Sequence, residues 1–261
     1  MTLYDRIGKE YDSTRRADPA IAHRLIELSE IRPGMKCLDI ACGSGNYTIE
    51  LAKTGAELTG IDQSETMIDL ARKKESSVLW FTGRAESLPF PDNKFDGAIC
   101  TLAVHHFSSP ETVFKEVRRV ISRGHFVIFT STKEQMRNYW LNRYFPSAMK
   151  ASIEKMPSFA RIIDGLTGAG FSEIFRIPYF VNDELKDMFL YSGKYKPELY
   201  LDPDFRMGIS TFASLAGKEE ISRGCRELRD DIHSGKIGEI INSYKNDLGD
   251  YLFIDAEKTG Y

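Results

Sequence analysis

A glycine turn that follows an acidic residue is the stretch with the clearest chemical potential. Residues 37–48 read CLDIACGSGNYT, so Gly43 and Gly45 follow an apolar segment that contains Asp39. Glycines in such a turn let the backbone pass close to a ligand. A carboxylate just before the turn repels phosphates but suits a ligand with an ammonium group and a positive centre.

The turn departs from the dinucleotide fingerprint. That fingerprint is GxGxxG at the start of a helix, and here Thr48 stands at the third glycine position. Asp62 ends the second predicted strand, where a carboxylate accepts hydrogen bonds from two vicinal ribose hydroxyls. Together these residues favour an adenosine-containing ligand without a pyrophosphate. They argue against a nicotinamide oxidoreductase.

Two adjacent histidines, His105 and His106, lie just past the fourth predicted strand. A parallel sheet presents its ligand-binding edge at that end of its strands. The pKa of histidine is close to working pH, so either ring can take a proton as a general base. The alternative interpretation is that one histidine holds the loop by hydrogen bonds while the other contacts the cofactor.

The pattern of apolar segments predicts the elements that position these residues. The first five predicted strands are residues 36–40, 57–61, 78–82, 95–102 and 125–130. Helical patterns separate them, which implies parallel βαβ crossovers. Segments 171–181 and 250–256 are also strand-like. We therefore expect an α/β fold with a Rossmann-like, doubly wound and mainly parallel seven-stranded sheet.

A mostly helical segment separates the last two predicted strands, and it is long for a connection in a compact domain. We expect residues 182–248 to form a helical lid on a core made of residues 1–181 and 249–261. The lid is aromatic and not basic, which suggests an apolar or aromatic small molecule as the substrate.

Four residues are tentative substrate contacts. A helical pattern at 133–145 carries Tyr139, Trp140 and Tyr144, which we expect to divide between packing and pocket. Arg206, in the predicted lid, can pair a substrate carboxylate bidentately, although a surface salt bridge is the simpler interpretation.

Composition narrows the choice of partners. The 261-residue chain has 35 basic and 38 acidic residues and a net charge of −3, so whole-chain charge gives no pull toward nucleic acid or anionic membranes. A charged N-terminus and the lack of a long apolar run argue against a signal peptide or membrane span. The four cysteines form no CxxC pair, which favours reduced thiols in a cytoplasmic protein. No cysteine or histidine cluster has zinc-ligand spacing, so no metal is expected.

Four segments together carry a resemblance to a known family. They read LDIACGSG, LTGIDQSETMIDLAR, GRAESLPFPDNKFDGAIC and TLAVHHF, and they cover about residues 35 to 130. In this order and spacing they resemble the class I S-adenosylmethionine (SAM)-dependent methyltransferases of the type 11 group. The resemblance implies SAM as the cofactor and S-adenosylhomocysteine (SAH) as its product.

The same resemblance implies a set of cofactor contacts in this chain. They are Asp39, Ala41, Gly43, Gly45, Asp62, Gln63, Met67, Ala85, Glu86, Thr101 and His106. The N-terminal helices, residues 1–30, resemble a segment that closes over the cofactor. Its expected contacts are Tyr11 and Arg16, with Arg16 facing the methionine carboxylate.

Two departures from the family pattern affect this site. Ala41 replaces the usual first glycine of the turn, and Arg84 stands where an aspartate usually accepts from the adenine amine. We expect the Ala85 backbone or Glu86 to accept that bond instead.

Three functions stay open. A small-molecule methyltransferase leads, an RNA- or protein-modifying methyltransferase is second, and a non-catalytic SAM-binding protein is third. The methylated atom is open, and so is the choice between monomer and homodimer.

Overall fold

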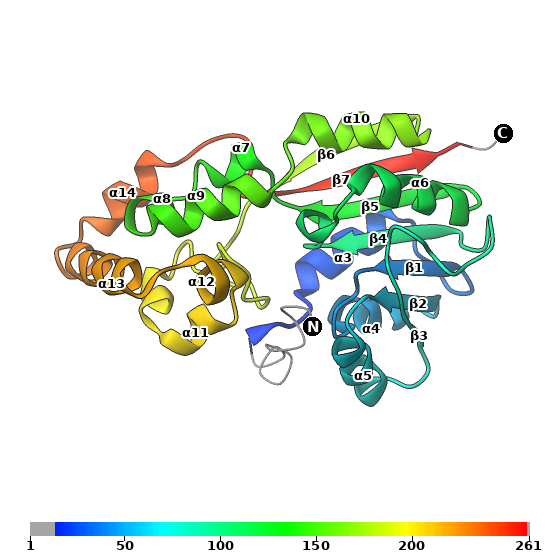
Figure 1. Cartoon of the computed structure of the whole chain (residues 1–261), viewed down its shortest axis with the longest axis horizontal. Coiled ribbons are helices and arrows are strands. Elements are labelled where there is room, and N and C mark those ends of the chain that lie inside the picture. Colours follow the sequence, from blue (N-terminus) through cyan, green and yellow to red (C-terminus); the bar gives the residue numbers. More distant parts are fainter. Residues whose placement is uncertain (1–13, 260–261) are drawn as a thin grey trace.

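The computed structural model describes residues 14–259. Its centre is a seven-stranded sheet of order β3-β2-β1-β4-β5-β7-β6 (Figure 1). The strands are β1 Lys36–Ile40, β2 Glu57–Asp62, β3 Leu79–Thr82, β4 Gly97–Thr101, β5 Gly124–Thr130, β6 Glu173–Tyr179 and β7 Tyr251–Lys258. The first five are parallel, and β7 is antiparallel to both β5 and β6. The predicted Rossmann-like α/β fold is confirmed.

Helices cover both faces of the sheet (Figure 1). One face carries α3 Pro19–Leu28, α4 Asn46–Ala52 and α5 Glu65–Lys74, and the other carries α6 Pro110–Val120 and α10 Phe159–Ala169. Strand β5 shows why two cores form, because alternate residues of a strand point to opposite faces. Phe126 and Ile128 pack on the α6 side, and Val127 and Phe129 pack on the α3 side.

Side-chain caps fix where the helices begin. Asp18 accepts from the backbone N–H groups of Ala20 and Ile21 at the start of α3, and Pro19 occupies the first helical position. Ser64 caps α5 in the same way. The Ser64 cap starts α5 directly after β2, whereas the Asp18 cap starts α3 ahead of the first strand.

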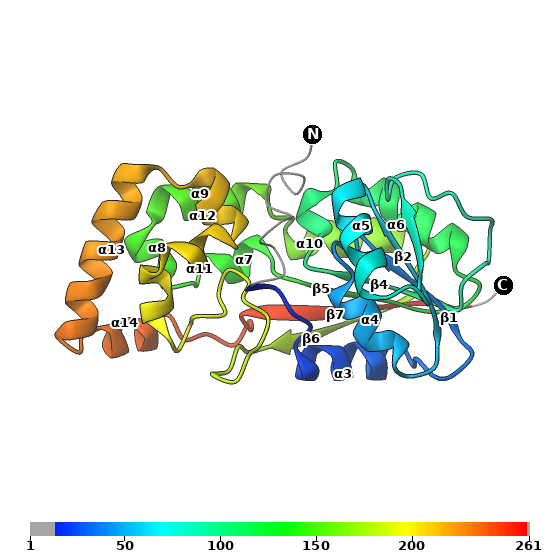
Figure 2. The same cartoon turned by 90° about the horizontal axis from the view of Figure 1, so that it is seen from below.

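A second group of helices lies beyond the carboxyl end of β5 (Figures 1 and 2). It consists of α7 Lys133–Met136, α8 Leu141–Tyr144, α9 Pro146–Lys155, α11 Pro203–Met207, α12 Ser210–Leu215, α13 Lys218–His233, α14 Ile237–Ser243 and the 3₁₀ turn η2 Pro197–Leu201. Helix α9 packs on α12, and α8 packs on α13. This helical layer therefore begins at residue 133, whereas the expected lid began at residue 182.

The helix expected at 133–145 is broken in two. The side-chain amide of Asn142 donates to the carbonyls of Met136 and Tyr139, at 2.8 and 2.6 Å, and so satisfies groups that α7 leaves open at its end. Pro146 then begins α9, where a missing backbone N–H carries no cost.

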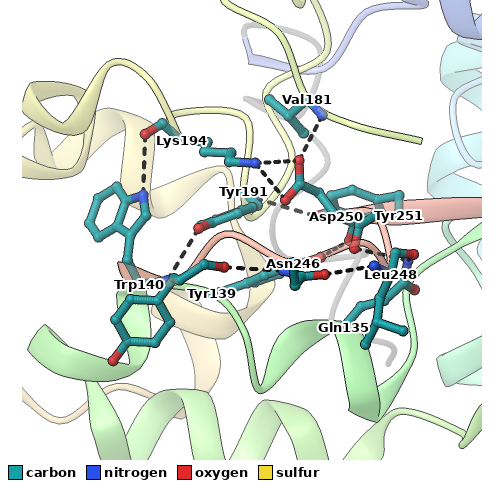
Figure 3. A network of polar contacts seen from close by, with 12 residues as sticks. Gln135, Tyr139, Trp140, Val181, Tyr191, Lys194, Asn246, Leu248, Asp250 and Tyr251 are labelled. Atoms are coloured by element: carbon teal, nitrogen blue, oxygen red, sulfur yellow. Dashed lines mark hydrogen bonds and ion pairs between the residues drawn. The ribbon is translucent and has the colours of Figure 1, made fainter. Parts of the chain in front are cut away.

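The described chain passes between the sheet and the helical layer at four places, and one polar network joins them (Figure 3). The Lys194 ammonium lies 2.9 Å from both carboxylate oxygens of Asp250, just before β7. Asp250 also accepts from the Val181 N–H at 2.8 Å, and Gln135 donates to the carbonyl of Leu248 at 3.1 Å. Removal of one partner from a buried ion pair costs about 3–5 kcal/mol, so this network holds the layer against the sheet.

Between residues 14 and 259, no helix combines the length and the apolar composition that a membrane span requires.

Candidate functional site

A cleft lies at the carboxyl ends of β1, β2 and β4, the edge where parallel sheets bind ligands. It consists of two adjoining hollows that share Arg15, Ala41, Gly43 and Thr101. We call the two hollows together the strand-end cleft. One of them, the inner hollow, is also lined by residues that follow β2 and β4. The other, the outer hollow, is also lined by residues of the glycine turn and α4. The predicted cofactor contacts that line the cleft are Arg16, Asp39, Ala41, Gly43, Asp62, Gln63, Met67, Ala85, Glu86, Thr101 and His106.

The glycine turn after β1 shapes the floor of the cleft. Ala41, Gly43 and Gly45 have φ angles of 56°, 55° and 79°. Such angles are natural for glycine but strain alanine, so Ala41 keeps the backbone of the glycine it replaces at an energetic cost.

Gly45 is not among the residues that line the cleft. A side-chain carbon at Gly45 would lie 2.3 Å from the ring of Trp80. This glycine therefore allows Trp80 to pack beneath the turn, and its predicted cofactor contact has no support in the cleft geometry.

Two backbone N–H groups fix the carboxylate of Asp62 at the end of β2. Gly43 donates to Oδ2 at 3.0 Å, and Ser64 donates to Oδ1 at 2.8 Å. A carboxylate oxygen can accept more than one hydrogen bond. The pair of oxygens thus fits two vicinal hydroxyls of a ligand in the cleft.

Asp39 presents a buried acceptor to the outer hollow. The hydroxyl of Thr48 donates to its Oδ2 at 2.6 Å, while Oδ1 has no hydrogen-bond partner among the described residues. Burial raises the pKa of Asp39 to about 7, the Thr48 bond lowers it, and the charge of Asp62 raises it further. An unpaired buried acceptor costs about 1–3 kcal/mol, so an ammonium group that donates to Oδ1 would relieve a real penalty.

The predicted adenine loop is held by Glu86. Its carboxylate accepts from the N–H of Ser108 at 3.1 Å and from the Ser108 hydroxyl at 2.6 Å. Arg84 lies 3.5 Å from the same carboxylate, and its exposed side chain does not line the cleft. The Arg84 departure therefore leaves the cleft open. Phe107, which the sequence pattern did not indicate, supplies an aromatic ring to this end of the cleft.

Arg15 is the main cleft residue that the sequence pattern missed. It lines both hollows, and its guanidinium forms a bidentate pair with Asp187, at 2.6 and 3.1 Å. The hydroxyl of Tyr47 also donates to Asp187, at 3.1 Å. These contacts tie the N-terminal segment, α4 and the helical layer together over the outer hollow. Arg16 lines that hollow as well, and Tyr11 lies outside the described residues.

A larger cavity of about 310 Å³ lies between the sheet and the helical layer, and we call it the inner cavity. It shares Arg15, Leu102 and His106 with the strand-end cleft. Its remaining lining residues are His105, Thr130, Ser131, Met136, Ser152, Lys155, Met156, Phe189, Leu190, Gly208, Ile209, Ser210, Thr211, Ser214, Leu215 and Tyr251. A ligand in the cleft and one in the cavity would therefore meet at the shared residues.

The two histidines stand at this meeting point. Their rings are 3.9 Å apart, and the backbone N–H of His106 donates to Ala103 within the 3₁₀ turn η1 Val104–His106. Burial, together with the positive charges of Lys155 and Arg15, lowers the pKa of His106 to about 4. Burial and the neighbouring charges also place the pKa of His105 well below its ordinary value. Both shifts favour the neutral form of the ring, and His106 is an exposed residue in the ligand-free protein.

Three of the four tentative substrate residues are core aromatics. Tyr139 stacks on Tyr191 with ring centroids 3.9 Å apart. Trp140 donates from its indole nitrogen to the carbonyl of Lys194 at 3.2 Å. Tyr144 is equally buried. None of the three lines the inner cavity, because their large rings fill the interior of the helical layer instead.

The fourth, Arg206, also lies away from the inner cavity. Its guanidinium donates to the carbonyl of Tyr200 at 2.6 Å. The helical layer contributes other residues, which the sequence pattern gave no reason to single out. They include Met136, Ser152, Lys155, Phe189 and Thr211.

Within the described part of the chain, no three histidine, cysteine, aspartate or glutamate side chains gather in a group that could hold a metal ion.

Each of the three comparisons with known proteins finds methyltransferases. A family model described as "Methyltransferase domain" matches residues 38–129. A solved structure from Anabaena variabilis ATCC 29413, described as a "putative methyltransferase from antibiotic biosynthesis pathway", is 33% identical with a TM-score of 0.82. That match covers 93% of this chain and 98% of the other. A SAM-dependent methyltransferase from Thermotoga maritima shares the fold at 18% identity and a TM-score of 0.57, with 98% of each chain covered.

Among curated proteins, demethylmenaquinone methyltransferase of Staphylococcus aureus (strain MRSA252) is 32% identical over 143 residues. The match covers 51% of this chain and 59% of that enzyme. The similarity to this curated relative therefore spans little more than half of its length.

Proposed function

We propose that this chain, which belongs to the class I SAM-dependent methyltransferases, transfers a methyl group from SAM to a small molecule held in the inner cavity. One observation carries the proposal. The strand-end cleft, whose residues suit SAM, shares Arg15, Leu102 and His106 with a separate cavity of about 310 Å³. Two ligands can therefore be bound side by side.

The residues of the cleft divide the work of holding SAM. Asp62 binds the ribose hydroxyls, because two backbone donors already fix its carboxylate. Asp39 binds the ammonium group through its unpaired Oδ1. Met67, Ala85 and Phe107 surround the adenine with apolar and aromatic surface.

The methionine end lies in the outer hollow. Arg16 lines that hollow and is exposed, which suits a contact with the methionine carboxylate. Arg15 lines the same hollow, but its guanidinium is paired with Asp187. We therefore assign Arg15 a structural role in the wall of the hollow.

Methyl transfer needs alignment and the exclusion of water more than it needs acid–base chemistry. When bound, SAM supplies a methyl group activated by its sulfonium charge. The acceptor atom of the substrate forms a bond to the methyl carbon as the methyl–sulfur bond breaks, and the electron pair of that bond remains on sulfur. An acceptor that carried a proton releases it to solvent.

His106 is placed to orient the acceptor, since it lines both the cleft and the cavity. With a pKa near 4 it is a weak base, so we assign it a hydrogen-bonding role toward the acceptor. His105 lines only the inner cavity, where its buried Nδ1 has no partner among the described residues and suits a substrate donor.

A small molecule is favoured over RNA or protein because the cavity is walled by both the sheet and the helical layer. The relatives act on, or are associated with, small molecules by name: demethylmenaquinone in one case and an antibiotic pathway in the other. We propose that this chain also acts on a small molecule, and we assign neither of these specific compounds to it.

Calorimetric titration with SAM, SAH and NAD tests the cofactor, on wild type and on Asp62→Ala. We expect micromolar binding of SAM and SAH, no binding of NAD, and at least about tenfold weaker binding in Asp62→Ala. Asp69→Ala is the matched control, because Asp69 is an exposed residue of α5 paired with Arg72. Binding of NAD alone, or full SAM affinity in Asp62→Ala, would contradict the proposal.

Transfer itself is measured with SAM labelled in the methyl group and a panel of small apolar acceptors. Turnover excludes a non-catalytic SAM-binding role. Labelling of RNA or protein without labelling of any small molecule would support the RNA- or protein-modifying alternative.

A further inference from the structure

The inner cavity is positively charged and free of acid. Among the described residues that line it, Lys155 and Arg15 are cationic, and none is an aspartate or a glutamate. The chain as a whole has more acidic than basic residues, 38 against 35. From this composition, a lining of this size would be expected to include carboxylates. Because the described lining has none, the cavity favours negatively charged ligands.

The two cations are not equivalent. Arg15 is neutralised by the bidentate pair with Asp187. Lys155, the last residue of α9, forms no ion pair with any carboxylate in the described part of the chain. The positive charge of Lys155 nevertheless acts on the two adjacent histidines, because it lowers the pKa of both His105 and His106. Lys155 is thus the cation of this cavity lining that has no carboxylate partner among the described residues.

The rest of the lining combines apolar side chains with neutral polar ones. Met136 and Met156 come from residues 133–156, as Lys155 does, and Phe189, Leu190 and Ile209 come from residues 189–209. The hydroxyls of Ser152 and Thr211 hydrogen-bond to each other at 2.9 Å, so a ligand need not supply a polar partner for both of them. A ligand that suited this cavity would be mainly apolar with one polar, negatively charged end.

We propose that the substrate carries an anionic group, a carboxylate or an ionised phenol, on an apolar body, and that Lys155 binds this group. The inference rests on the proposed function, since it names the class of molecule that enters the same cavity. A second cation reinforces it: the sulfonium of SAM, in the adjoining cleft, also favours an anion. Two weakly basic histidines are consistent with a substrate that does not depend on them for ionisation.

The test compares two probes of one shape, 2-naphthoate and 2-naphthamide, which differ in charge. Each is titrated by calorimetry into SAH-saturated protein, as wild type, Lys155→Gln and Lys155→Arg. Lys150→Gln is the matched control, because Lys150 is an exposed lysine of the same helix that does not line the cavity. Thermal unfolding of each variant verifies that it is folded.

We expect wild type to bind the naphthoate about tenfold more tightly than the naphthamide, a modest factor because Lys155 is solvent-accessible and its attraction is partly screened. Lys155→Gln should reduce the preference to about twofold or less, while Lys155→Arg and Lys150→Gln retain it.

Equal binding of the two probes by wild type overturns the inference, as does a preference that survives in Lys155→Gln. Failure of the naphthoate to bind at about millimolar concentration also overturns it. In these outcomes SAH still binds, so the proposed function stands. Loss of SAH binding by wild type overturns both.

Discussion

Proton release on SAM binding offers a sharp test of the role of Asp39. In the ligand-free protein, burial raises the pKa of Asp39 to about 7, so the carboxyl is mostly protonated at pH 6. An ammonium group that donates to Oδ1 favours the charged form and lowers that pKa. Binding at pH 6 should therefore expel most of one proton, about 0.9 if the pKa falls well below 5.

The measurement is calorimetric titration of SAM at pH 6 in two buffers with different ionisation enthalpies. The difference between the apparent binding enthalpies gives the number of protons released. This pH avoids two other sources of protons: the amino group of SAM is already charged, and the ring of His106 is already neutral, since its pKa is about 4.

Asp39→Asn removes the titrating group but keeps the shape of the side chain. We expect this variant to release no proton and to bind SAM about 10- to 100-fold more weakly at pH 7.5, where the wild-type carboxylate is charged. Asp69→Asn, on the exposed face of α5, should behave as wild type. An unchanged proton count in Asp39→Asn, or no buffer dependence in wild type, would refute the assignment of Asp39 to the ammonium group.

The same pKa shift has a consequence for folding. The native pKa of Asp39 lies above its value in the unfolded chain, so its protonated form stabilises the ligand-free protein at low pH. That contribution is complete below about pH 4 and is lost as pH rises to about 7, at about 1.4 kcal/mol per pH unit between these limits. SAM should therefore raise the melting temperature more at pH 8 than at pH 5.

Two further predictions concern the turn and the histidines. Ala41→Gly should stabilise the protein by up to about 1 kcal/mol, because relief of about 1–2 kcal/mol of left-handed strain exceeds the entropy that glycine adds to the unfolded chain. The control variant Ala151→Gly, inside α9, should destabilise the protein by about 1 kcal/mol. Thermal unfolding measures both changes. The pH profile of kcat should lack an inflection near 6.5, since the pKa of His106 is about 4. His106→Ala should change kcat more than it changes SAM affinity. An inflection near 6.5 that disappears in His106→Ala would show that His106 is a general base.

Much of the fold was predictable because its signals are local. The strand at Lys36–Ile40 and the helix capped by Ser64 follow from apolar periodicity and a single capping hydroxyl, both of which act within a few residues. The helix expected at 133–145 was wrong as a single element. Its break depends on Asn142, whose amide bonds across the turn to Met136, a contact that helical periodicity does not encode.

The candidate site divides along the same line. Asp62 and Gly43 could be paired from the sequence, because consecutive parallel strands bring their carboxyl ends to one edge of the sheet. Tyr139 and Trp140 could not be assigned, because an aromatic helix has the same pattern whether its rings line a pocket or fill a core. The packing of the helical layer placed them in the core.

The sequence by itself determined the individual strands, the glycine turn, and the acids at the strand ends, because each depends mainly on neighbours in the chain. Tertiary structure alone decided what closes the site and what enters it. Arg15 meets Asp187 across 172 positions, and Lys155 of α9 faces the same cavity as His106. Such contacts arise when separate elements pack together, and the free energy that selects them belongs to the whole core and not to any one segment.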